Sequence, residues 1–109
     1  MTASAGAALA KAILERFGDF RGRVEIVAPV SRPWSSIAFS GARHRLSLHI
    51  RGNGADAAAD RFRAGLDADG VTLAGHMLAD IAVTGDQRAD EGDSVRLNLE
   101  ALTVEARQA

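Results

Sequence analysis

Residues 34–51 read WSSIAFSGARHRLSLHIR. Polar and apolar residues alternate on both sides of Ser40-Gly41-Ala42-Arg43, and a period of two is typical of a strand with one buried face. Glycine at the first of two central positions is typical of a type II′ turn. The stretch therefore predicts a hairpin, with strands over 34–40 and 43–51 and the turn at Gly41-Ala42.

The segments on either side of this hairpin predict two helices and three further strands. Leu9, Ile13 and Phe17 recur at four-residue spacing after Ser4, which suits a capped helix over about 5–17. Comparable patterns predict a helix over about 55–66 and strands over 24–28, 71–83 and from 95 towards 104. Pro29 and Pro33 should separate the first strand from the hairpin.

This element order predicts a single α+β domain over residues 1–109. Two helices are too few to cover both faces of a five-stranded sheet, so a two-layer sandwich with both helices on one face is expected. The expected order is α-β-β-β-α-β-β with a mainly antiparallel sheet. The other face of the sheet must then meet water or a partner.

Composition excludes several classes of function. The chain has no cysteine, so disulfides and thiolate chemistry are ruled out, and a net charge of −1 does not suit a nucleic-acid-binding protein. No run approaches the roughly 18 apolar residues of a membrane span, so we expect a cytoplasmic protein without membrane contact. Twelve arginines against one lysine suggest a bacterial coding sequence.

The uncovered sheet face holds the candidate site. A turn at Gly41-Ala42 would pair Trp34 with His49, and would direct Ile37, Phe39, Leu46, Leu48 and Ile50 to the core. An indole beside guanidinium groups suits a protein partner or an anionic or aromatic ligand. The residues expected on this binding or interface surface are Trp34, Arg45, His49, Arg51, Asp80 and Arg96.

Apolar residues also fall on this face. Leu78 and Ala82 have the parity of the outer side, and the last strand changes phase so that Leu102 and Val104 are even-numbered. Either a bulge lies near residues 100–101, or the far end of this strand is apolar on its outer side. The second alternative favours a homodimer or another protein contact through this face.

The charge is divided unevenly along the chain. Residues 1–54 have 8 basic and 3 acidic side chains (+5), whereas residues 55–109 have 5 basic and 11 acidic ones (−6). This division favours self-association between surfaces of opposite potential, or neutralisation between neighbouring strands of one chain.

We therefore expect a binding or assembly module rather than an enzyme. The alternative is a small-molecule-binding domain or enzyme at the same face or at a dimer interface, with His49 and Asp80 as acid or base and Arg45 or Arg51 as anion clamp. His44 and His49 have opposite parity and His76 lies on another strand, so no metal and no cofactor are expected. We expect His44 at the margin of the core, beside the turn.

Overall fold

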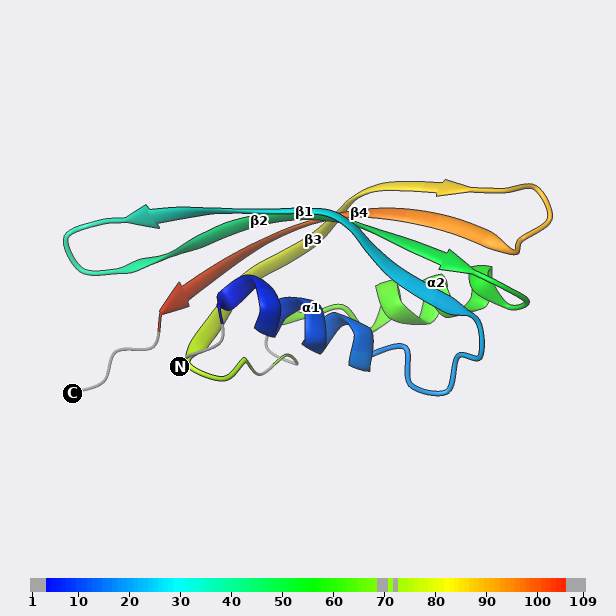
Figure 1. Cartoon of the computed structure of the whole chain (residues 1–109), viewed down its shortest axis with the longest axis horizontal. Helices are drawn as coiled ribbons and strands as arrows, with labels where there is room; N and C mark the ends of the chain where they lie inside the picture. Colours follow the sequence, from blue (N-terminus) through cyan, green and yellow to red (C-terminus); the bar gives the residue numbers. More distant parts are fainter. Residues whose placement is uncertain (1–3, 69–70, 72, 106–109) are drawn as a thin grey trace.

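The computed structural model describes residues 4–68, 71 and 73–105. Four antiparallel strands form one sheet in the order β1-β2-β4-β3. Both helices lie on the same side of this sheet (Figure 1), which we call the helix face, and the opposite side is the outer face. The two-layer α+β architecture is thus confirmed. The elements are α1 (Ala5–Glu15), β1 (Arg23–Ser35), β2 (Ser40–Arg51), α2 (Ala55–Ala64), β3 (His76–Arg88) and β4 (Ser94–Glu105).

The sheet has four strands in the described residues, not the five we expected, so the order is α-β-β-α-β-β. β1 runs without a break through both prolines. It is an edge strand, where a missing backbone N–H costs no ladder hydrogen bond. The chain passes Pro29 in a bulge between Val27 and Val30, where Ala28 has a φ of 51°. Proline here marks a bulge and not a strand end.

The hairpin exists, but its turn was wrongly predicted. β1 and β2 join through residues 36–39, with Ser35 opposite Ser40 and Trp34 opposite Gly41. Ser36 closes this turn: its backbone N–H donates to the Phe39 carbonyl (2.7 Å), and its Oγ accepts from the Phe39 N–H (3.2 Å). Ile37 and Phe39, expected in the core, are exposed at the tip.

Gly41 has a different role from the one its sequence context suggested. A Cβ at this position would lie 1.9 Å from the carbonyl oxygen of Thr103 on β4. Glycine is therefore required because the β4 backbone approaches closely, not because of a turn.

The expected strand over 71–83 begins five residues late. Leu73 and His76 form only an isolated bridge around Gly75, whose φ is 77°, while residue 72 lies outside the described residues. A bulge between Leu78 and Asp80 then changes the phase of β3. Leu78 is consequently buried on the helix face, and its expected place on the outer face was wrong.

The pairing of β4 decides between the two alternatives that its sequence left open, a bulge near residues 100–101 or an apolar outer side. β4 pairs with β2 in unbroken register from Ser94 to Val104, so it contains no bulge. Leu102 and Val104 therefore lie on the outer face, as the second alternative stated.

The core lies between the helices and the two central strands. Aromatic stacking of Phe17 on Phe62, with ring centroids 4.9 Å apart, joins the segment after α1 to α2. The fully buried large side chains are Leu9, Ile13, Leu48, Ile50, Val95, Leu97, Leu99 and Thr103. All of the strand residues among them lie on the helix face, so this core leaves the outer face uncovered.

Candidate functional site

The outer face can be described as rows that cross the four strands. Near the start of β1, one row contains Glu25, His49, Arg96 and Gln87. Near the β1–β2 turn, another contains Trp34, Gly41, Val104 and Met77, which we call the apolar row. The face therefore changes from polar to apolar along its length.

All six predicted site residues lie on the outer face, but they do not form one cluster. His49, Arg51 and Arg96 lie together at the polar end. Trp34 faces Gly41, eight residues before His49 on β2, so Trp34 and His49 are roughly 26 Å apart at about 3.3 Å per residue. The expected Trp34–His49 pairing was wrong, because it depended on the misplaced turn.

His49 bridges two strands at the polar end. Arg96 Nε donates to His49 Nε2 at 2.7 Å, and Arg51 Nη2 lies 3.4 Å from His49 Nδ1. A neutral imidazole has one acceptor nitrogen, which Arg96 occupies. His49, Arg51 and Arg96 thus form a positively charged cluster at the rim. Because Arg96 already donates to Nε2 of His49, this nitrogen is not free to accept from a substrate.

The middle of the face has a shallow depression lined by both charge types. Arg45 Nε donates to Glu100 Oε1 at 3.1 Å, and both side chains are largely exposed. Arg43, Asp80 and Leu102 line the same depression. An exposed pair of this kind contributes at most about 1 kcal/mol to stability, so its position matters more than its strength.

His49 and Asp80 cannot act as an acid–base pair. Asp80 is opposite Leu102 and His49 opposite Arg96, so they are six residues apart along β4, roughly 20 Å, on strands that are not neighbours. The proposed catalytic pairing was wrong. Within the described residues, no three His, Asp or Glu side chains form a group that could hold a metal ion.

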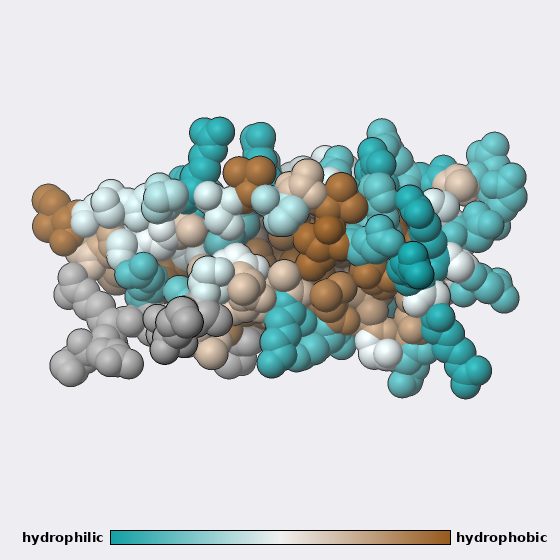
Figure 2. Space-filling model, viewed as in Figure 1, coloured by the Kyte–Doolittle hydropathy of each residue, from teal (hydrophilic) through white to brown (hydrophobic). Residues whose placement is uncertain are grey.

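Trp34 lies in the apolar row. Its side chain is half-buried, and its indole Nε1 is buried without a hydrogen-bond partner among the described residues. At the other end of the row, on the opposite edge of the sheet, Met77 is 63% exposed, and the turn that follows Trp34 exposes Ile37 and Phe39. Figure 2 shows hydrophobic surface at the left extremity, where the tip of the β1–β2 hairpin lies.

Sequence reasoning missed a buried polar cluster on the helix face. His44 is only 2% exposed, with Nδ1 2.7 Å from Ser31 Oγ and Nε2 2.8 Å from Thr103 Oγ1. Burial lowers the pKa of His44, and the nearby His76 ring acts in the same direction. We expected His44 beside the turn. The turn lies earlier in the chain, at residues 36–39, so His44 lies within β2 and away from the turn. The cluster contains no carboxylate, and its partners are hydroxyls, which suits a structural role.

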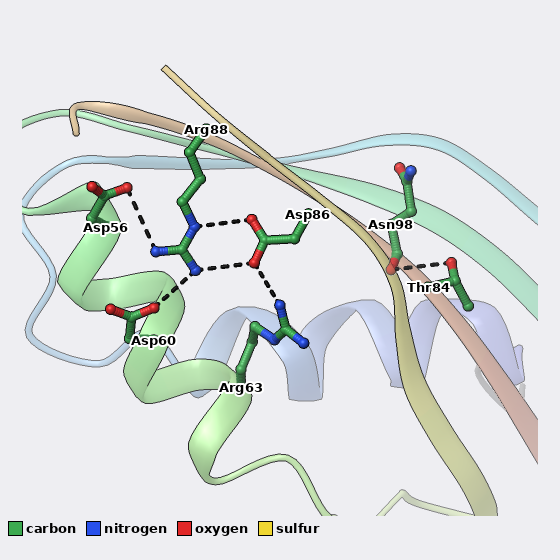
Figure 3. A network of polar contacts seen from close by, with 7 residues as sticks. All are labelled: Asp56, Asp60, Arg63, Thr84, Asp86, Arg88 and Asn98. Carbon is green, nitrogen blue, oxygen red and sulfur yellow. Dashed lines mark hydrogen bonds and ion pairs between the residues drawn. The ribbon is translucent and has the colours of Figure 1, made fainter. Parts of the chain in front are cut away.

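The second missed group links α2 to β3 (Figure 3). Arg88 lies 2.9 and 3.0 Å from the two carboxylate oxygens of Asp86, and also pairs with Asp60 and Asp56 on α2. Arg63 Nη1 donates to Asp86 at 2.6 Å. The hydrogen bond from Arg88, more than that from Arg63, lowers the pKa of Asp86 against the effect of burial. The strand expected to end at residue 83 continues through Asp86 to Arg88.

Comparison with known proteins gives one structural likeness. No protein-family model and no curated protein matches the chain. A chain in a solved structure described as the virion of native gene transfer agent (GTA) particle is similar over 95% of this chain and 100% of its own, with a TM-score of 0.62 and 19% identity. At this identity the likeness shows the fold alone. Neither helix in the described residues is long and apolar enough to cross a membrane.

Proposed function

We propose that this chain is an assembly subunit that binds copies of itself through its outer sheet face, as a structural component of a virion-like particle. The observation that carries this proposal is the apolar row, on a sheet face that neither of the two described helices covers. The fold shared with a chain of a gene transfer agent virion supports a role in a multi-subunit particle. We propose a bacterial source and assembly in the cytoplasm.

The order of residues across the face supports an interface. The apolar row is bordered by a row with Arg32, Arg43 and Asp80, so apolar side chains are followed by charged ones. Protein interfaces have this arrangement, with an apolar centre that excludes water and a polar rim. Trp34 would anchor such a contact, because a tryptophan combines a large apolar area with one N–H donor.

The length of the sheet also supports this reading. The principal extents are 50 × 24 × 23 Å, and the β1–β2 hairpin extends past both helices (Figure 1). Its tip therefore presents Ile37 and Phe39 to the surroundings without a covering element among the described residues. A protruding apolar hairpin of this kind is suited to contact with a neighbouring subunit.

The test compares two matched substitutions. Met77→Glu places a charge in the apolar row, whereas Leu14→Glu places the same charge at an exposed position of α1 (Leu14 is 42% exposed). Sedimentation velocity from micromolar to millimolar protein should give wild-type species heavier than 11.4 kDa. Met77→Glu should weaken this association about tenfold or more, because a buried unpaired charge is costly. Leu14→Glu should leave it unchanged.

Two results would contradict the proposal. One is a wild-type particle of 11.4 kDa at every concentration. The other is an equal effect of the two substitutions, which would mean that the apolar row has no special part in association.

A further inference from the structure

The outer face has an excess of positive charge. Its register positions contain six arginines, at 23, 32, 43, 45, 51 and 96, and three carboxylates, at 25, 80 and 100, which gives +3. Arg32 stands directly opposite Arg43 across β1 and β2. Like charges in such a pair destabilise the hairpin. Neither arginine forms an ion pair with a described residue, and Asp80, in the same row, is separated from Arg43 by β4.

At the opposite end of the molecule, α2 and the β3–β4 turn form an acidic group, next to the outer-face arginines Arg23, Arg51 and Arg96 of the same end. α2 and residues 86–93 together contain Asp56, Asp60, Asp86, Asp90, Glu91 and Asp93 against Arg61, Arg63 and Arg88, which gives −3. Arg63 already forms an ion pair with Asp86, and Arg88 forms one with Asp60 of α2. Asp90, Glu91 and Asp93 are exposed and have no ion pair with a described residue. Figure 2 shows this end, on the right, as mainly hydrophilic.

These two unpaired groups cannot neutralise each other within one chain. Arg43 is opposite Leu102, nine residues beyond Asp93, so the groups are separated by roughly 30 Å along β4. That distance is several times the Debye length of about 8 Å at physiological salt. Both groups are therefore available for contact with a second molecule.

We propose that Arg32 and Arg43 of one copy bind the acidic β3–β4 turn, Asp90 to Asp93, of a second copy. This inference rests on the proposed self-association and names the surfaces that meet. The arginines border the apolar row, so both features belong to one contact, with an apolar centre and a charged rim. Two different surfaces meet, so each copy keeps one of each kind available. Repetition of this contact gives a closed ring or an open chain rather than a symmetric dimer.

The experiment uses two charge-reversed variants of the full chain. The first contains Arg32→Glu and Arg43→Glu, and the second contains Glu91→Lys and Asp93→Lys. Each variant alone should associate at least about tenfold more weakly than wild type, because like charges then face each other. An equimolar mixture of the two should recover association, because every contact again joins opposite charges. Wild-type association should weaken with added salt.

Matched controls separate this contact from general charge effects. Lys11→Glu with Arg21→Glu, and Glu15→Lys with Asp19→Lys, make the same changes at exposed positions on or beside α1. They should associate as wild type does, and circular dichroism should show that all variants are folded.

The outcomes distinguish the two proposals. A wild-type protein that stays monomeric in sedimentation velocity contradicts the proposed function and this contact together. If wild type associates but the mixture does not recover association, only this contact is wrong. If the arginine variant associates normally but loses retention on a heparin column, the arginines bind a polyanion, and the proposed contact is likewise overturned.

Discussion

At the residue scale, the neighbours of His44 determine where its proton lies. The Thr103 hydroxyl lies 3.4 Å from the Ala42 carbonyl, so its oxygen is free to accept from the His44 Nε2–H. Nδ1 then accepts from the Ser31 hydroxyl. An imidazolium would have to donate from both nitrogens, which requires the Ser31 hydroxyl to turn its proton away. Burial and this arrangement both favour the neutral ring.

We expect His44 to make stability fall in mildly acidic solution. Its pKa is lower in the folded chain than its ordinary value of about 6.5, so the unfolded chain binds the proton first as the pH falls. The contribution is fully present above about pH 6.5 and is lost below it, by at most about 1.4 kcal/mol per pH unit until the folded ring also titrates. Urea unfolding between pH 8 and pH 5 measures this.

His44→Gln provides the comparison for that measurement. The variant should be less stable at neutral pH but show a flatter profile across this range. His49→Gln, on the outer face, leaves the buried cluster intact and should keep the wild-type decline. Parallel profiles for wild type and His44→Gln would show that another group is responsible.

At the element scale, the ion pairs of Arg88 attach α2 to the end of β3. α2 is short, and its N-cap residue, Gly54, has no side chain that could cap the helix. Contacts with the sheet must therefore hold the helix in place. Arg88 reaches two carboxylates of α2 while it holds Asp86 on its own strand. The contact is partly shielded, because the Arg88 and Asp86 side chains are 28% and 20% exposed. It also sets the position of the neighbouring acidic turn.

We expect Asp86→Asn to destabilise the fold by about 1 kcal/mol, because it removes a charged acceptor from two arginines. The lowered pKa of Asp86 means that its contribution is present above the unfolded value of about 3.9 and is lost as the pH falls through the folded value. Chemical denaturation at pH 7 and pH 3 should therefore show a difference from wild type that is smaller in acid.

Asp90→Asn is the matched control, because Asp90 is exposed and has no ion pair with a described residue. It should change stability by less than about 0.5 kcal/mol. If both substitutions have the same small effect, the Arg88 contacts do not stabilise the attachment of α2.

At the scale of the whole molecule, the sheet is longer than the helix layer. Strands of 12 and 13 residues extend beyond helices of 11 and 10 residues, so the tip of the β1–β2 hairpin has no helix beneath it (Figure 1). A single layer of sheet buries little apolar area and is marginal by itself. Contact with further copies would supply the missing layer.

We therefore expect the thermal midpoint of unfolding to rise with protein concentration. Association that binds only the folded state stabilises it by about 1.4 kcal/mol for each tenfold excess over the dissociation constant. Scanning calorimetry at several concentrations should show this increase for wild type and a much smaller one for Met77→Glu. A midpoint independent of concentration in both proteins would argue against stabilisation by assembly.

The sequence alone determined the two helices, most of the strand segments and the inward face of the central strands. These features depend on local periodicity: Leu46, Leu48 and Ile50 alternate strictly, as do Val95, Leu97 and Leu99. For Leu102 and Val104 the sequence left two alternatives, and the second is correct, because both side chains lie on the outer face.

Only the tertiary structure decided the hairpin turn, the bulges and the clusters that depend on them. The local sequence around Gly41 fits a turn. The close approach of Thr103 to Gly41 and the closure of the loop by Ser36 place the turn at residues 36–39 instead. One extra residue in β1 and two in β3 change the face of the sheet on which the neighbouring side chains lie. For this reason Leu78 lies in the core and not on the outer face. His44 with Thr103, and Arg88 with Asp60, are far apart in sequence. Such pairs are brought together by strand register and helix packing, and no local pattern encodes them.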